Sequence, residues 1–318
     1  NMATPAERLA DSLEELRKLQ ERNKTVLQTE ELSRTNRERL LENGFLKEVI
    51  RGWYMITSPE ERQGDSTSWY SNFWHFCSRL LNEKYKENWC ISAEQSVQLH
   101  GGNWSVPGQL IVKSPEANNF KTDLLYGTSL FSMKSELPVK RETTEIEGIR
   151  MLTLPASLIH CSTNTYVQNV TDVRTALSMV TDSSEILNLL LEGGHSIIAG
   201  RLSGAFRNNG QVRIADDIIK TMTAVGYNIR EVDPFESKLM IKLSVREKSP
   251  YVNRIKLMWH EMRKSIIEIF PKAPGIPKDK ESYLKKVEGI YVTDAYHSLS
   301  IEKYKVTAEL IERVSSGE

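Results

Sequence analysis

The chain has 318 residues, of which 39% are hydrophobic and 26% are charged. These proportions are ordinary for a soluble globular protein and exclude a wholly disordered chain, and the length suffices for two or three domains. Lysine and arginine total 42 and aspartate and glutamate total 42, so a basic field of the whole molecule cannot drive nucleic-acid binding, and any such contact needs a local patch.

Cysteine usage and apolar run lengths indicate the compartment. Cys77, Cys90 and Cys161 are far apart and lack the paired spacing of metal sites, which predicts buried thiols, no metal site and a reducing cytoplasm. No apolar run approaches the roughly 20 residues of a membrane helix, and the N-terminus has no apolar signal core. We therefore expect a cytoplasmic protein without a membrane partner. Asn1 ahead of Met2 is interpreted as the remnant of an expression tag.

The first 60 residues predict helices followed by a hairpin. Leucines at spacings of three and four in residues 6–22 indicate an amphipathic helix. Thr29 and Ser33 are typical caps of two short helices. Two apolar segments then flank Gly52, which favours a hairpin with a tight turn. Helix, helix and hairpin in this order predict a winged helix-turn-helix domain over residues 1–60.

The segment from Leu40 to Ile56 resembles the opening domain of AbiEi-type antitoxins, a winged helix that recognises operator DNA. A recognition helix beginning at Ser33 directs its basic side chains toward phosphates or base edges, and the wing supplies others. The predicted DNA contacts are Arg34, Arg37, Arg39, Lys47 and Arg51. In the alternative interpretation these residues only form a solvent-exposed surface and contact no DNA. Nearby glutamates cancel much of their charge, and a winged helix often docks a protein instead.

A polar linker over residues 60–67 precedes the second predicted domain, residues 66–165. An aromatic-rich helix opens this domain, and its aromatic density is more typical of a core than of a ligand cage. A strand at residues 109–113, with others near 123–130 and 149–154, predicts a sheet covered by helices. The region from Cys90 onward resembles the central domain of AbiEi-like antitoxins, which implies a mixed α/β domain supporting the winged helix.

Residues 170–318 predict a helical region. Its glycine-containing segment 193–204 lacks the Gly-Lys-Ser/Thr ending and the preceding strand of a phosphate loop, so it does not indicate nucleotide binding. Small residues in and beside it predict close helix packing: Ala199, Gly200, Gly204 and Ala205. Pro250 suits the first turn of a further helix with one apolar side. The stretch from Leu187 to Phe235 resembles the region that precedes the catalytic domain in a group of bacterial Fic proteins.

Ser298 and Glu302 are four residues apart, so on a helix they share one face. Segment 294–303, for which Asp294 is a suitable N-cap, resembles the inhibitory motif of Fic proteins, Ser/Thr-x-x-x-Glu followed by Gly or Asn. The resemblance implies that the glutamate pairs with the active-site arginine of the Fic domain. That arginine would otherwise hold the γ-phosphate of ATP. A carboxylate suits this role because it pairs bidentately with a guanidinium. Lys303 departs from the family motif, which bears on how tightly the helix docks.

Fic domains transfer AMP from ATP to a hydroxyl side chain with a loop that reads His-x-Phe-x-Asp/Glu-Gly-Asn-Gly-x-x-Arg. No such loop occurs in this sequence, and no nucleophile and base at a suitable spacing indicate another reaction. We therefore predict no catalytic residue and no cofactor in this chain. ATP and magnesium are implied only for a missing Fic core. We expect a chain truncated before that core, whose partner is the downstream Fic domain, in cis or in trans.

The expected fold is α+β, with a winged helix, a mixed α/β domain and a helical region that ends in the inhibitory helix. The first functional hypothesis is a regulatory fragment of a Fic adenylyltransferase that restrains AMP transfer and binds DNA through its winged helix. The second is an AbiEi-type antitoxin or autorepressor that binds operator DNA. A third hypothesis treats the middle helices as a scaffold for a target protein.

Overall fold

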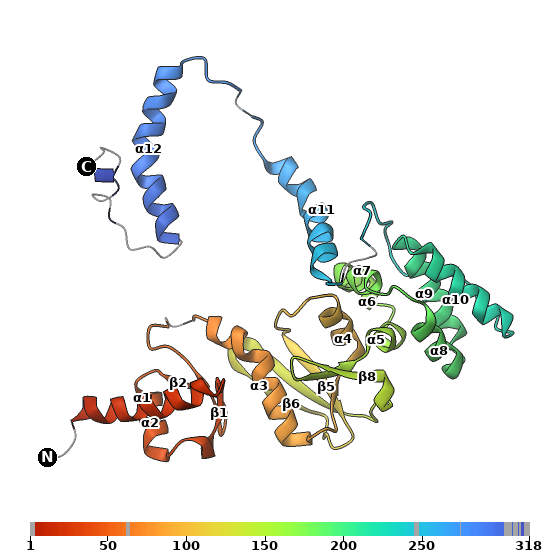
Figure 1. The fold of residues 1–318 in the computed structure, drawn as a ribbon, viewed down its shortest axis with the longest axis horizontal. Helices are drawn as coiled ribbons and strands as arrows, with labels where there is room; N and C mark the ends of the chain where they lie inside the picture. Colours follow the sequence, from red (N-terminus) through yellow and green to blue (C-terminus); the bar gives the residue numbers. More distant parts are fainter. Residues whose placement is uncertain are drawn as a thin grey trace. The chain divides into compact units, whose positions relative to one another are not determined.

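The computed structural model describes residues 4–61, 64–244, 248–273 and 275–301, together with positions 307, 311, 313 and 314. The chain forms two compact units, Asn1–Met262 and Arg263–Glu318. The fold is α+β, as predicted, and the described residues contain three small sheets among many helices (Figure 1).

The first unit opens with a helix, a strand, a second helix and a hairpin. The elements are α1 (Pro5–Glu21), β1 (Val26–Gln28), the 3-10 helix η1 (Thr29–Glu31), α2 (Arg34–Glu42), β2 (Leu46–Ile50) and β3 (Trp53–Ile56). The strands form an antiparallel sheet in the order β1-β3-β2. The hairpin β2–β3 lies at the position of the predicted wing, and we refer to it as the wing. One of the two predicted short helices is only a single 3-10 turn, and Gln28 rather than Thr29 is its N-cap.

The small sheet has a core on each side. On one side, leucines of α1 and α2 pack with Leu27, Leu46 and Tyr54. On the other side, Val26, Val49, Trp53 and Met55 belong to the core of the following segment. Trp53 meets Phe76 edge to face, with ring centroids 5.9 Å apart. The N-terminal elements therefore share a hydrophobic core with the chain that follows residue 66.

The middle of the first unit is a mixed sheet covered by helices. Its elements are α3 (Thr67–Tyr85), β4 (Cys90–Ile91), α4 (Ala93–His100), β5 (Gln109–Ser114), β6 (Phe120–Asp123), η2 (Leu125–Gly127), β7 (Ser129–Lys134), η3 (Lys140–Glu142), β8 (Thr143–Ile146) and β9 (Ile149–Leu152). The main sheet has the order β4-β5-β7-β6, with β5 and β7 parallel. The strand predicted near 123–130 is wrong in its bounds, because that stretch is the turn between β6 and β7, where Tyr126 has φ of 52°.

Helices dominate the rest of the first unit. They are α5 (Leu154–His160), α6 (Thr165–Gln168), α7 (Val170–Ser178), α8 (Ser184–Gly193), α9 (Ser196–Asn208), α10 (Val212–Ala224) and α11 (Tyr251–Ile269), the last of which crosses into the second unit. Helices α5 to α10 share one core with α4, centred on residues such as Phe206 and Ile218. Gly194 ends α8 in a left-handed conformation, and α9 follows directly, so no strand precedes this glycine pair.

Two glycines of α9 allow another segment to come unusually close. The segment that follows α10 runs in extended form along α9, and the Val232 amide donates to the Gly200 carbonyl oxygen at 3.1 Å. A Cβ at Gly204 would lie 2.2 Å from the Val232 carbonyl oxygen, and one at Gly200 would lie 2.0 Å from the Arg230 carbonyl oxygen. The close packing was predicted, but the partner is an extended chain and not a helix.

The second unit contains α12 (Lys280–Ile301), which begins well before Asp294. The prediction that Asp294 is an N-cap is therefore wrong, because this residue lies inside a longer helix. Asp279 precedes the helix, and its side chain accepts a hydrogen bond from the Ser282 amide at 3.1 Å, which is the geometry of a cap.

Candidate functional sites

Arg37 and Arg39, two of the predicted DNA contacts, hold the N-terminal elements together. The Arg37 Nη1 donates to the Thr29 carbonyl oxygen at 2.9 Å, and its guanidinium lies 5.7 Å from the centre of the Tyr54 ring. The Arg39 Nη1 donates to the Arg8 carbonyl oxygen and to the Ser12 hydroxyl, both at 2.8 Å. Arg37 thus fastens α2 to η1 and the sheet, and Arg39 fastens α2 to α1.

Lys47 of the wing is also engaged within the protein. Its ammonium donates to the Tyr126 hydroxyl at 2.7 Å and lies 4.6 Å from the centre of that ring. The Tyr126 hydroxyl donates in turn to the Asp65 carbonyl oxygen at 2.5 Å. This chain of contacts joins the wing to the turn between β6 and β7.

Arg34 and Arg51 are the two predicted DNA contacts that stay at the surface. The Arg34 side chain is 82% exposed and pairs with Glu38 on the same helix at 2.7 Å. The hydrogen bond and the charge of Glu38 raise the pKa of Arg34. Arg51 is exposed in the turn of the wing. The five predicted residues therefore do not form one free basic surface.

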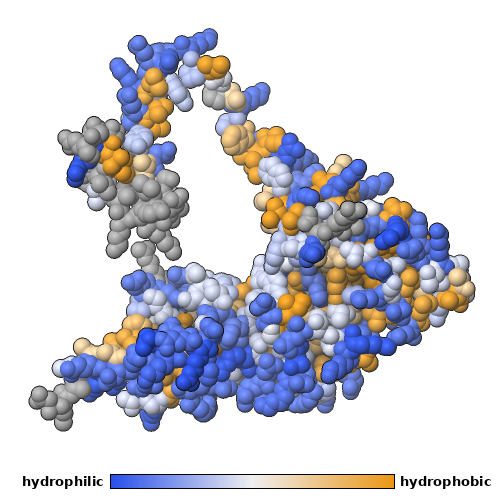
Figure 2. Space-filling model, in the orientation of Figure 1, coloured by the Kyte–Doolittle hydropathy of each residue, from blue (hydrophilic) through white to orange (hydrophobic). Residues whose placement is uncertain are grey.

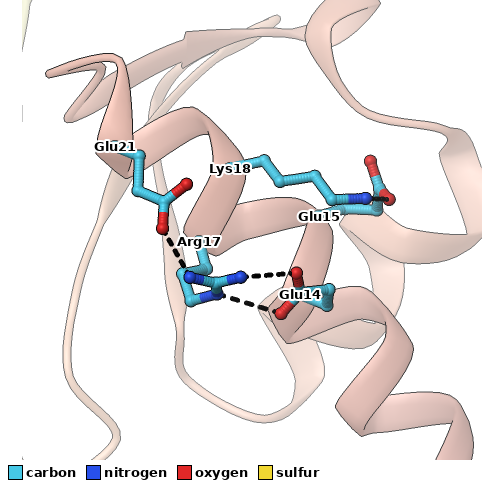
Figure 3. Close-up of polar contacts among 5 residues, drawn as sticks. All are labelled: Glu14, Glu15, Arg17, Lys18 and Glu21. Carbon is cyan, nitrogen blue, oxygen red and sulfur yellow. Dashed lines mark hydrogen bonds and ion pairs between the residues drawn. The ribbon is translucent and has the colours of Figure 1, made fainter.

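The outer surface of α1 adds no basic excess to this region. Arg17 pairs with Glu14 at 2.7 Å and also with Glu21, and Lys18 pairs with Glu15 at 2.8 Å (Figure 3). These pairs are exposed, and exposed pairs contribute little to stability. They do cancel charge, so phosphate neutralisation in this part of the molecule depends on few residues.

The predicted inhibitory motif begins at the end of α12. Ser298 lies in the last turn of the helix, whereas Glu302 lies outside the described residues. Apolar residues upstream on the same helix are exposed: Tyr283, Leu284, Val287, Ile290 and Tyr291. Their 3–4 spacing gives α12 an apolar side.

The sequence prediction missed a buried ion pair between α7 and α11. Arg254 pairs with Asp172, whose other carboxylate oxygen accepts from the Asn103 amide at 3.0 Å. The pair borders a groove of about 650 Å³, which is also lined by Met240 and Met258. Nothing in the local sequence pattern signals this pair, because its partners are far apart along the chain.

Among the described residues, the thiols and the metal-type ligands give no further candidate site. The three cysteines are buried, as predicted, and burial raises the pKa of the Cys161 thiol to about 11. Among the residues that the structure describes, no group of histidine, cysteine and carboxylate side chains is arranged to hold a metal ion. In the same parts of the chain, no helix has the length and apolar character needed to span a membrane.

No family model and no curated protein matches this chain. A solved structure, that of the RV2827C protein from Mycobacterium tuberculosis, is similar with a TM-score of 0.45 and 13% sequence identity. The similarity covers 79% of this chain and 94% of that one.

Proposed function

We propose that this chain regulates a Fic-type AMP transferase domain, in cis or in trans, through the helix that carries Ser298. The observation that supports the proposal is that position 298 and several exposed apolar residues lie on the same side of α12. With about 100° between successive helical residues, positions 283, 287, 290, 291 and 298 fall within roughly a third of the circumference. An apolar stripe of this kind on a surface helix normally faces a partner. On such a helix, position 298 falls on the same side as the apolar stripe.

The chemistry of inhibition rests on Glu302. Its carboxylate would pair with the guanidinium that otherwise holds the γ-phosphate of ATP, and the nucleotide then cannot take its productive pose. ATP and magnesium belong to the transferase domain, and this chain supplies no residue to bind them. The apolar side of α12 would hold the helix against that domain, so that the carboxylate arrives already positioned.

The test is an AMP transfer assay with the chain added in excess to a Fic-type domain that has no inhibitory motif of its own. Transfer from labelled ATP should fall when the wild-type chain is present. Glu302→Ala should weaken the inhibition at least about tenfold, because charge-assisted hydrogen bonds contribute about 1.5–3 kcal/mol each. Ser298→Ala should have a smaller effect in the same direction.

Glu288→Ala provides the matched control, since Glu288 is an exposed glutamate on α12 about 80° beyond the Ser298 position. This variant should inhibit as the wild type does. The proposal fails if the wild-type chain leaves the transfer rate unchanged, or if Glu302→Ala and Glu288→Ala inhibit equally.

We propose operator DNA as a second partner, in line with the antitoxin or autorepressor alternative. The element order α1-β1-η1-α2-β2-β3 supports this proposal, and so do the exposed positions of Arg34 and Arg51. Arg37, Arg39 and Lys47 already have partners within the protein and are weaker candidates. The proposed DNA contacts are therefore the exposed arginine at the start of α2 and the one in the wing.

A further inference from the structure

The extended segment of residues 229–240, here called the strap, lies along α9 in the manner of a bound peptide. Within this range, all of which the structure describes, only Pro234 and Phe235 are buried. In the recognition of extended peptides, main-chain hydrogen bonds supply affinity and pockets for a few side chains supply specificity. The strap is held in both ways. The strap and the residues that hold it all belong to the first unit, Asn1–Met262.

The backbone of the strap is bonded to α9. The Val232 amide donates to the Gly200 carbonyl oxygen at 3.1 Å. The side-chain amide of Asn208 donates to the Ser237 carbonyl oxygen at 3.1 Å and accepts from the Leu239 amide at 3.2 Å. The strap comes this close because α9 has no side chain at Gly200, where a Cβ would lie 2.0 Å from a strap carbonyl oxygen. These bonds engage main-chain groups that any extended segment possesses.

Phe235 is the anchor of the strap. Its ring meets Tyr166 edge to face, with centroids 5.5 Å apart, and the Arg174 guanidinium lies 4.0 Å from its centre. Arg174 is buried, and its Nη2 donates to the Ser237 carbonyl oxygen at 2.8 Å. The strap therefore supplies a ring and a carbonyl oxygen to a buried cation. Loss of these partners would be costly, so the site favours an occupant that offers the same groups.

Two acidic residues of the strap meet polar side chains of α9. Glu231 pairs with Arg207 at 2.7 Å, and the Asp233 carboxylate accepts from the Asn208 amide at 2.6 Å. They precede Phe235 by four and two residues. On the face shown in Figure 2, the surface formed by α8 to α10 carries hydrophobic and hydrophilic residues side by side. Selection of an occupant therefore rests on the anchor and on these two acidic positions.

We propose that this surface of α9, with Tyr166 and Arg174, is a docking site for an extended segment of a partner protein with the pattern Glu-x-Asp-Pro-Phe. In the free chain the strap occupies the site. A tethered segment has an effective concentration on the order of millimolar, so the strap competes with the partner and sets the affinity at which it docks. The proposal depends neither on AMP transfer nor on DNA binding.

The experiment measures fluorescence polarisation of a labelled peptide with the sequence of residues 229–240 against the whole chain. The variant E231Q/D233N weakens the strap of the chain and leaves Phe235 in place. The new amide at position 233 can still accept the bond that the Phe235 amide donates to Asp233 at 3.0 Å, so the local turn is kept. This variant should bind the peptide about tenfold more tightly than the wild-type chain, because its own strap competes less.

Phe235→Leu in the chain is a second way to weaken the strap. It keeps an apolar side chain at the anchor but removes the ring that faces Arg174, so it should also raise the affinity for the peptide. Glu236→Gln is the matched control, because it changes an exposed glutamate of the strap outside the pattern. This control should bind the peptide as weakly as the wild-type chain does. A peptide with alanine in place of Phe235 should bind none of the chains.

The proposal is overturned if neither E231Q/D233N nor Phe235→Leu binds the peptide more tightly than the wild-type chain. It is also overturned if the alanine peptide binds as tightly as the parent peptide. Sedimentation velocity tests a different occupant. A concentration-dependent dimer of the wild-type chain that Phe235→Leu abolishes would show that the site takes the strap of a second copy, and the partner assignment would then be wrong.

Discussion

Lys47 in the wing and Tyr126 in the turn between β6 and β7 are joined by a hydrogen bond of 2.7 Å from the ammonium to the hydroxyl. The residues are 79 positions apart in sequence. Tyr126 keeps a left-handed backbone, with φ of 52°, which a non-glycine residue adopts at a cost. The contact therefore joins the wing to a turn that the surrounding packing holds in place. Because the Lys47 ammonium is engaged in this contact, Lys47 is a weaker candidate for binding DNA.

Removing the Tyr126 hydroxyl should destabilise the first unit. Tyr126→Phe is expected to lower the free energy of unfolding by about 1 kcal/mol, because two hydrogen bonds are lost while the ring remains. Lys47→Ala should cost a similar amount, and the double variant should cost less than the two changes added together. Urea unfolding measures these values. Tyr70→Phe, at an exposed tyrosine, is the control with little effect, and strictly additive changes would show that the two residues are not coupled.

Arg34→Ala and Arg51→Ala should each weaken binding to a duplex from the gene's own promoter. Each change should also reduce the slope of log affinity against log salt by about one, as expected for the loss of one phosphate contact. Arg39→Ala should instead lower the unfolding temperature, because Arg39 joins α2 to α1. A mobility-shift series over salt concentration separates these effects. Absence of binding at low salt would remove the DNA proposal.

Gly204→Ala should destabilise the first unit by about 1–3 kcal/mol, although alanine is the better helix former. The reason is the Val232 carbonyl oxygen, 2.2 Å from where the new methyl group would lie, which forces the extended segment away from α9. Gly108→Ala is the matched change, since no atom lies within 4 Å of its Cβ position. Thermal unfolding of both variants checks the prediction, which is wrong if they have the same melting temperature.

His100 should make the fold less stable in mild acid. Burial lowers the pKa of His100 below its ordinary value of 6.5, although its ring nitrogen lies 2.8 Å from the Leu152 carbonyl oxygen. Below about pH 6.5 the unfolded chain takes up a proton that the folded chain resists, so the free energy of unfolding falls as the pH falls toward the lowered pKa. Above pH 6.5 both states are neutral and this contribution vanishes.

Chemical denaturation between pH 5 and 7 measures this dependence. His100→Gln removes the titrating group and should give a shallower loss of stability than the wild type over that range. His260→Gln, at an exposed position, is the control for a histidine-to-glutamine change. Identical slopes for the wild type and His100→Gln would contradict the assignment.

Local patterns predicted much of the secondary structure because caps and periodicity act within a few residues. Ser33 caps α2, and the leucine spacing of residues 6–22 became α1, in which Leu16 is buried. The aromatic residues of α3 form a core, with Trp69 and Phe73 fully buried. Prediction was poorer for α12, since a suitable cap at Asp294 does not by itself end the helix that comes before it.

The candidate sites depended on more than spacing. The sequence by itself predicted that basic residues recur in a helix and in the hairpin that follows it, and that Ser298 and Glu302 have a helical spacing. Only the tertiary structure decided that Arg39 bonds to Ser12 and Lys47 to Tyr126, and that Asn253 of α11 is buried against Ser178. The physical reason is that a cation or an apolar side chain takes whichever partner the packing of distant segments brings near, and local periodicity carries no information about those segments.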